Sequence, residues 1–439
     1  MPDPFSAAFV RAIDANRTLK EELTAAIMGQ SARRRISVTD LVNPRQAFFR
    51  WTHPEVQPSP DRAQFMLAGT GFHDLFGRTV STEEFVEQFV EYEGVVGKID
   101  MYEDVPVELK TTGSNPDAPG AARAAYVDQL AMYCTMTGAG SGRLLIYRRE
   151  QFGRQPALRA FRVEFPDLSP IRAEMLRRRD MFREALDRND PGDLPQCEWF
   201  GRNCDYAEIC HCDTAPVMTR VVPPDGYRIE RDAAIEAKFL EQLSSPYDRP
   251  GGFRLNDLVF PRKAAFERTM PDEEEEPADA IEVRLRELER QGFRGTLQRA
   301  LRFGIPGAFV NQPVKLRTLT DRVGMFRDVP TLMRVTKFRE MVERDRLPQA
   351  MGHYFDRLAF ECALSGHNRG RLVLYYEALG EKFMVYDVGF KDVAAVIAEA
   401  DRRLALLESG AAASELPACP AWMAKFCRYK DRCGCGDAV

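Results

Sequence analysis

Residues 105–112 read VPVELKTT, residues 121–136 read AARAAYVDQLAMYCTM and residues 142–150 read GRLLIYRRE. The first and third stretches are short, apolar and typical of strands. The stretch between them carries apolar residues at helical spacing and predicts a helix. A strand, a helix and another strand in this order predict an α/β fold.

The flanking sequence extends this unit in both directions. Residues 84–103 predict two strands joined by a tight turn, and residues 171–188 predict a helix that follows the last strand. The opening segment, residues 7–28, has a helical pattern. The expected architecture is a small mixed sheet flanked by helices.

This pattern occurs twice in the 439 residues. YVDQLAMYCTMTG at residues 126–138 matches YFDRLAFECALSG at 354–366, and ISVTDLVNPRQAFFR from Ile36 matches FRLNDLVFPRKAAFE from Phe253. The chain therefore reads as a tandem repeat, which we divide into a first half (residues 1–213), a linker (214–226, rich in proline) and a second half (227–439).

Composition limits the classes of function. The chain has 61 Lys and Arg against 66 Asp and Glu, so it is not a polycation that binds nucleic acid through bulk charge. No apolar run has the length of a membrane span, and the N-terminus has neither the basic nor the apolar region of a signal peptide. We expect a cytoplasmic protein without a membrane partner.

Eight of the ten cysteines fall into two groups, one at the C-terminal end of each half. The first group is Cys197, Cys204, Cys210 and Cys212, and the second is Cys419, Cys427, Cys433 and Cys435. Both groups end in C-x5-C-x-C. Clustered cysteines in a cytosolic chain favour metal binding over disulfides, and four thiolates suit either zinc or an iron-sulfur cluster.

Charged residues on the predicted strands of the first half indicate a hydrolytic site. Asp100 follows one strand, while Glu108 and Lys110 are two residues apart on the next and project from the same face. Carboxylates at a sheet edge are hard ligands for Mg²⁺ or Mn²⁺, and the lysine could orient or deprotonate a water for attack on phosphorus.

Three further residues are placed to support this site. His73, on a preceding helix, could add a nitrogen ligand that favours Mn²⁺. Gln129 and Tyr133 are four residues apart on one helix face and could hold a nucleotide near the metal.

The order GTGFHDLF, GKID, VELKTT and DQLAMY resembles the His, Asp, Glu-x-Lys and Gln-x3-Tyr motifs of the RecB-like nucleases, including their CRISPR-associated relatives, in the PD-(D/E)XK superfamily. This resemblance covers most of residues 36–212. It implies a restriction-endonuclease-like core in which His73, Asp100, Glu108 and the backbone carbonyl of Leu109 hold the metal. It also implies that Lys110 activates water and that Gln129 and Tyr133 position the substrate.

The same resemblance favours an iron-sulfur cluster of the 4Fe-4S type in each cysteine group, with zinc as the alternative. Iron-sulfur members of the family usually carry a cysteine where this chain has Pro44, but four cysteines remain at the end of each half. The absence of C-x2-C pairs also distinguishes both groups from ordinary zinc ribbons. We expect the metal to hold the C-terminal tail to its domain.

The second half lacks every predicted catalytic side chain. The repeat alignment gives the replacements His73 to Arg294, Asp100 to Gly324, Glu108 to Leu332, Lys110 to Arg334, Gln129 to Arg357 and Tyr133 to Glu361. We therefore predict a pseudonuclease. Its three arginines would suit binding a DNA backbone; the alternative is a purely structural half.

The predicted function is a divalent-metal-dependent deoxyribonuclease, an exonuclease or end-processing enzyme acting on single-stranded DNA or duplex ends. Recombination, repair, phage replication and spacer acquisition are the settings that this prediction suggests. The alternative is a non-catalytic DNA-binding or assembly protein on the same fold. A third possibility is the nuclease arm of a helicase complex, in which a partner supplies ATP hydrolysis because the chain has no GxxxxGK(S/T) loop.

Overall fold

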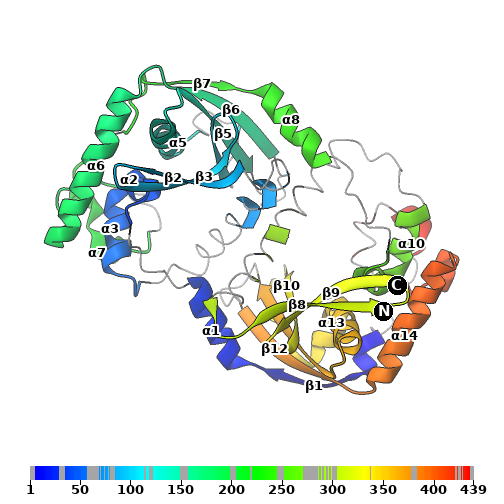
Figure 1. Cartoon of the computed structure of the whole chain (residues 1–439). Helices are drawn as coiled ribbons and strands as arrows, with labels where there is room; N and C mark the ends of the chain where they lie inside the picture. Colours follow the sequence, from blue (N-terminus) through cyan, green and yellow to red (C-terminus); the bar gives the residue numbers. More distant parts are fainter. Residues whose placement is uncertain are drawn as a thin grey trace. The chain divides into compact units, whose positions relative to one another are not determined.

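Figure 1 shows the computed structural model of the chain. The described residues are 5–28, 35–56, 69, 71–73, 75–77, 79, 85–112, 115–117, 122–148, 157–197, 204–217, 220–244, 252–269, 285, 288, 291–292, 295, 298, 304–336, 338–376, 383–420, 423, 427 and 429–435. They form a mixed α/β structure with two mixed sheets flanked by helices.

The chain divides into two compact units. Unit one comprises Met28–Pro246 and Glu275–Thr296, and unit two comprises Met1–Ile27, Tyr247–Glu274 and Leu297–Val439. Each unit contains one six-stranded sheet.

The sheet of unit one consists of consecutive strands in chain order. They are β2 (Val86–Tyr92), β3 (Val95–Tyr102), β4 (Pro106–Thr112), β5 (Ser141–Arg148), β6 (Ala157–Glu164) and β7 (Arg228–Arg231). Strands β4 and β5 are parallel, joined through helix α5 (Ala124–Thr137), and the other neighbours are antiparallel. A parallel pair requires such a crossover, which is why the strand–helix–strand stretch sets the fold.

The sheet of unit two has the same pairing pattern. Its order is β8 (Phe309–Leu316), β9 (Leu319–Phe326), β10 (Val329–Thr336), β11 (Arg369–Tyr376), β12 (Phe383–Phe390) and β1 (Val10–Ala15). Here β10 and β11 are the parallel pair, and helix α13 (Gly352–Leu364) follows β10 in the chain.

The remaining helices also occur in matching order. The first half has α1 (Arg17–Met28), α2 (Val38–Val42), α3 (Pro44–Thr52), α6 (Ser169–Arg188) and α7 (Ala207–Cys210). The second has α8 (Ala233–Ser244), α9 (Leu255–Val259), α10 (Pro261–Thr269), α14 (Val393–Glu408) and α16 (Lys430–Cys433). Short elements are η1 (Phe5–Ala8), η3 (Cys212–Thr214), η5 (Arg344–Arg346), α12 (Leu347–Ala350) and η6 (Ala413–Glu415).

The two halves exchange their first strand and helix. Strand β1, from the start of the chain, pairs antiparallel with β12, and β7, from the start of the second half, pairs antiparallel with β6. Figure 1 shows blue β1 beside the orange strand β12, and green β7 at the edge of the other sheet. The expectation of an uninterrupted helix over residues 7–28 is therefore wrong, because Val10–Ala15 completes an edge of a sheet and only Arg17–Met28 is helical.

The exchange also changes the domain boundaries. The sequence suggested divisions at residues 213 and 227, whereas unit one extends through the proposed linker to Pro246 and includes Glu275–Thr296. Within that second piece, Leu285 and Leu288 are buried in the same cluster as Phe72 and Phe76. The domain boundaries do not follow the order of the sequence, because each sheet takes one of its edge strands, β1 or β7, from the other half.

A buried aspartate anchors each exchanged segment. Asp128 on α5 accepts hydrogen bonds from the backbone N–H groups of Val221 and Val222, both buried, at 3.1 and 3.2 Å. Its counterpart Asp356 accepts from the N–H of Ser6 at 2.8 Å. Part of the predicted linker 214–226 is thus packed chain, and the conserved position of this aspartate in the repeat has a structural explanation.

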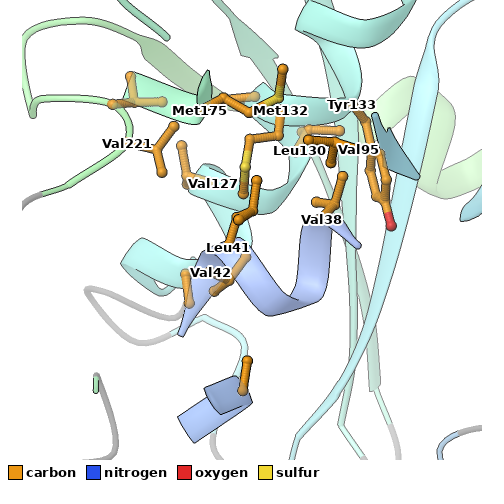
Figure 2. Close-up of a cluster of buried hydrophobic side chains, with 14 of the residues drawn as sticks. Val38, Leu41, Val42, Val95, Val127, Leu130, Met132, Tyr133, Met175 and Val221 are labelled. Atoms are coloured by element: carbon orange, nitrogen blue, oxygen red, sulfur yellow. The ribbon is translucent and has the colours of Figure 1, made fainter. Parts of the chain in front are cut away.

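The main core of unit one lies between α5 and the segment that contains α2 (Figure 2). Val38 and Leu41 of α2 meet Val127 and Leu130 of α5 in this cluster, and Tyr133 lies at its margin. The cluster holds α5 in place, and α5 in turn carries two of the predicted site residues.

Among the described helices, none is both long and apolar enough to cross a membrane.

Candidate active site

Three neighbouring elements of unit one bring the predicted polar residues together. Asp100 is near the end of β3, Glu108 and Lys110 are on β4, and Gln129 and Tyr133 are on α5. The parallel register pairs Glu108 with Leu144 and Lys110 with Ile146 of β5, both in the core beneath α5. Because side chains alternate along a strand, Glu108 and Lys110 share the α5 face.

A chain of hydrogen bonds links these side chains. Lys110 Nζ forms an ion pair with Glu108 Oε1 and donates to Gln129 Oε1 at 2.8 Å. Gln129 Nε2 donates to the Tyr133 hydroxyl at 3.3 Å, and that hydroxyl donates to the backbone carbonyl of Lys98 at 3.0 Å. The lysine is thereby held in one orientation.

His73 and Asp100 form the other side of the arrangement. His73 Nδ1 lies 3.3 Å from Asp100 Oδ1, and the Leu109 N–H donates to Asp100 Oδ2 at 2.8 Å. Both side chains are partly exposed, with about a fifth of each accessible, at 23% and 22%. The backbone of Leu109 thus meets Asp100 through its N–H, while the resemblance assigns its carbonyl to the metal.

Burial and charge separate the two carboxyl groups. Burial, reinforced by the negative charge of Asp100, raises the pKa of Glu108 to about 7 despite the attraction of Lys110. Burial also opposes ionisation of Asp100, but the charge and hydrogen bond of His73 outweigh it and lower the pKa of Asp100. Burial opposes the charge on Lys110 too, yet the negative charge of Glu108 raises the pKa of the amine.

One oxygen of this site has no partner among the residues that the structure describes. Glu108 is 2% exposed, and its Oε2 is buried without a hydrogen bond to any of them. A buried carboxylate oxygen without a partner is energetically unfavourable, and a divalent cation beside Asp100 and Glu108 would satisfy it. As the side chains stand, no group of three or more His, Cys, Asp or Glu among the described residues could hold a metal ion. The fit to a cation therefore rests on the donor chemistry and on this oxygen.

Gly97 is a site residue that sequence reasoning did not identify. A Cβ at Gly97 would lie 2.7 Å from Cε1 of Tyr133, so only glycine allows the tyrosine to approach β3. In the strand alignment, Gly97 corresponds to Asp321, and this change coincides with the replacement of Tyr133 by Glu361. That covariation within the repeat was the available signal.

The second half has an ion-pair network where the first half has the site. Arg357 Nε bonds Glu361 Oε1 at 2.6 Å, and Arg357 Nη2 lies 3.4 Å from Asp321 Oδ2. Arg357, Glu361 and Asp321 stand where the first half has Gln129, Tyr133 and Gly97. The guanidinium group of Arg357 therefore balances the charges of both carboxylates.

The other replacements in the second half remove metal ligands. Leu332 is buried and lacks side-chain oxygens. A Cβ at Gly324 would lie 3.1 Å from Cζ of Phe309, so the phenyl ring lies close to the position of the lost aspartate side chain. Arg334 lies over the Tyr354 ring at 5.9 Å. Arg294 is outside the described residues.

In each half, cysteines of the group lie near the N-terminal end of a helix, α3 in the first half and α10 in the second. All eight thiols are free of disulfides. In the first group, burial, with the neighbouring thiols Cys212 and Cys204, raises the pKa of Cys197. In the second, burial, reinforced by Cys435, raises the pKa of Cys419 to about 12. Thiols have the donor chemistry of a thiolate-bound metal centre, and metal binding would ionise them, but as they stand the described cysteines form no group that could hold a metal ion.

An arginine connects each cysteine group to the helix that precedes it. Arg45 at the start of α3 donates from Nε to the Cys210 carbonyl at 2.8 Å, and Arg262 donates from Nη1 to the Cys433 carbonyl at 2.9 Å. An aromatic pair accompanies each contact: Phe49 with Tyr206 at 6.2 Å, and Phe266 with Tyr429 at 5.3 Å. The support of the cysteine groups is thus the same in both halves, although only the first half keeps the acidic site.

No protein-family model matches the chain, and no curated protein matches it. A solved structure described as "Crystal structure of SSO0001" is similar over 44% of this chain and 94% of its own, with 19% identity and a TM-score of 0.31. A similarity at this level carries no argument about fold family or function.

Proposed function

We propose that the chain is a divalent-metal-dependent nuclease of the PD-(D/E)XK type that hydrolyses phosphodiester bonds of DNA in its first half. The observation that carries the proposal is the buried Glu108 oxygen without a partner, beside Asp100 and an amine held by Gln129. A pair of carboxylates and a fixed ammonium group suit attack of water on phosphorus. Restriction-endonuclease-like tandem domains are part of this proposal.

Asp100 and Glu108 would hold the cation, with His73 and the Leu109 carbonyl as the further ligands implied by the resemblance. The cation would polarise the phosphoryl group and lower the pKa of water. Because the pKa of Lys110 is raised by Glu108, the lysine is a charged donor. It therefore suits holding the attacking water or a phosphate oxygen better than removing a proton. Gln129 and Tyr133 maintain its direction.

The second half has a structural role in this proposal. Arg357 is engaged by two acids, so this residue does not support the alternative of a phosphate-binding surface. What the second half contributes is the strand β7 and the segment 275–296 that complete unit one.

The cysteine groups are proposed as 4Fe-4S clusters that hold each C-terminal segment, with zinc as the alternative. Absorption spectroscopy and metal analysis of anaerobically purified protein distinguish the two. A brown protein with about eight iron atoms supports the iron-sulfur clusters. A colourless protein with about two zinc atoms supports a zinc site in each cysteine group instead.

Cleavage of end-labelled DNA tests the proposal. Native protein, Glu108→Gln and Lys110→Ala are incubated with single-stranded DNA, duplex DNA and RNA of the same sequence, in Mg²⁺, Mn²⁺ or EDTA. We expect metal-dependent cleavage by native protein and a loss of at least about 100-fold in each variant. Glu361→Gln and Arg334→Ala, at positions of the second half, are matched controls that should cut normally.

Binding of DNA without cleavage by metal-loaded native protein would instead support a non-catalytic assembly protein. Products from 5′- and 3′-labelled strands give the polarity. Addition of a helicase partner tests whether the chain serves as the nuclease arm of a recombination, repair, phage or CRISPR-associated complex.

A further inference from the structure

The ring of Tyr126 lies beside two cations at the edge of the candidate site. Lys110 Nζ is 5.5 Å from the ring centroid, and Cζ of Arg123 is 5.9 Å from the same centroid. Lys110 is the amine that bonds Glu108 and Gln129. Arg123 and the proposed catalytic lysine therefore contact the same aromatic ring.

Helix α5 begins directly after Arg123, which is its N-cap residue. The Arg123 carbonyl accepts the N–H groups of Tyr126 and Val127 at 2.9 and 3.3 Å, so the backbone supports the first helical turn. Arg123 is only partly buried. A planar cation on an aromatic face loses little freedom when it binds a phosphate, and its fork matches phosphate oxygens.

The second half keeps the tyrosine and loses the arginine. Tyr354 has Arg334 over its ring at 5.9 Å and donates its hydroxyl to the Val335 carbonyl at 3.1 Å. The N-cap residue of α13 is Met351, which is fully buried. The second half therefore lacks the acidic site but keeps a basic residue, Arg334, over the tyrosine. The N-cap arginine of the first half is absent from the second half, as the acidic site is.

We infer that Arg123 is a substrate-positioning residue that contacts a backbone phosphate of the nucleic acid beside the one being cleaved. The inference rests on the proposed function. A polyanion that approaches Asp100 and Glu108 is repelled by them, and Arg123, beside the same tyrosine ring as Lys110, adds positive charge near the site. A cap that only stabilised α5 would not require a cation.

The test compares Arg123→Ala and Arg123→Lys with native protein on a fluorescein-labelled single-stranded oligodeoxynucleotide. Cleavage is followed in Mn²⁺ and binding by anisotropy in Ca²⁺ across a salt series. We expect Arg123→Ala to raise KM about 10-fold with kcat within about twofold, and to make the slope of log affinity against log salt shallower by about 0.7. Arg123→Lys should lie between, because lysine keeps the charge but not the fork.

Arg172→Ala is the matched control, since Arg172 also lies over a tyrosine ring, Tyr92, at 5.7 Å. It should keep the native KM and salt slope. A substrate with one neutral methylphosphonate beside the cleaved bond should lose affinity for native protein but not for Arg123→Ala. This readout does not respond to a merely structural role.

An unchanged KM and salt slope in Arg123→Ala, with native protein active, overturns this inference and leaves the nuclease intact. Native protein that binds but does not cut rejects the nuclease, while the salt series still tests the phosphate contact. Native protein that neither binds nor cuts overturns both.

Discussion

Tyr133 packs against the bare backbone of Gly97, where an added Cβ would stand 2.7 Å from the tyrosine ring. This contact places the tyrosine hydroxyl within reach of the Lys98 carbonyl and of Gln129. The orientation of Lys110 therefore depends on a glycine one strand away. In the second half an aspartate stands at the glycine position and a glutamate replaces the tyrosine, with Arg357 bonded to both.

Gly97→Ala should displace Tyr133 and weaken the site. We expect a loss of about 1–3 kcal/mol in the free energy of unfolding, because the added methyl group has no space, and a fall in nuclease rate larger than the fall in DNA affinity. Urea denaturation and cleavage kinetics measure these effects. Gly140→Ala is the control, since its Cβ would meet no atom closer than 4.0 Å. Equal effects of the two substitutions would refute the role of the Tyr133 contact.

A divalent cation should stabilise the first half. At a concentration about 100 times its Kd, Mn²⁺ would add about 2.7 kcal/mol to the free energy of unfolding and raise Tm by about 5–10 °C. The shift should vanish in Glu108→Gln and Asp100→Asn. It should persist in Glu361→Gln, where a buried glutamate with an equally unpartnered Oε2 is changed in the second half. A native Tm that does not respond to Mn²⁺ or Mg²⁺ contradicts the metal site, whatever the cleavage assay gives.

Arg357→Ala should destabilise unit two without weakening DNA binding. The substitution leaves Glu361, 4% exposed, and Asp321 without their shared cation, and breaking a buried ion pair costs about 3–5 kcal/mol. Urea denaturation measures the loss, and anisotropy measures the affinity for DNA. A folded Arg357→Ala protein with markedly weaker DNA binding would restore the alternative of a phosphate-binding second half.

Cleavage of the chain between Pro224 and Asp225 should leave the two pieces associated. Both residues are exposed, so a protease site can be inserted there. After cleavage the N-terminal piece still supplies β1 to β12, and the C-terminal piece still supplies β7 to β6. We expect the pieces to elute together on a sizing column and to separate only in denaturant. Separation under native conditions would show that the exchange of strands does not hold the pieces together.

Unit two should lose stability as pH falls from about 6.5 towards 4. Burial, assisted by the charge of Arg334, lowers the pKa of His353 to about 4. The unfolded chain therefore takes up a proton in this window that the folded state does not, so the free energy of unfolding decreases with decreasing pH and levels off below pH 4. We expect a loss of about 1–2 kcal/mol between pH 7 and 5.

Hydrogen exchange of peptides from α13, measured across this pH range, checks the effect locally. His353→Gln removes the titrating group and should flatten the dependence. If the variant keeps the native dependence, another group is responsible.

The strands and helices of this protein follow from local sequence patterns. The apolar alternation of β4 and the helical spacing of α5 predict both elements, and the repeat shows that the second half contains the same elements in the same order. A spacing of two along a strand predicts that Glu108 and Lys110 project from the same face of the strand. A spacing of four along a helix predicts the same for Gln129 and Tyr133 on their helix. These relations concern residues a few positions apart, where backbone geometry alone sets the direction of side chains.

Contacts between distant residues depend on packing that no local pattern contains. The pairing of β1 with β12 joins residues separated by most of the chain, and a helical pattern at residues 7–28 concealed the strand. The need for glycine at position 97 arises only when the ring of Tyr133 packs against it. The pKa of Glu108 is raised only when its side chain is buried beside Asp100. These effects belong to the assembled units: the exchange of edge strands, the close approach of a backbone and desolvation. Each contributes to the free energy only when two segments distant in sequence are in contact.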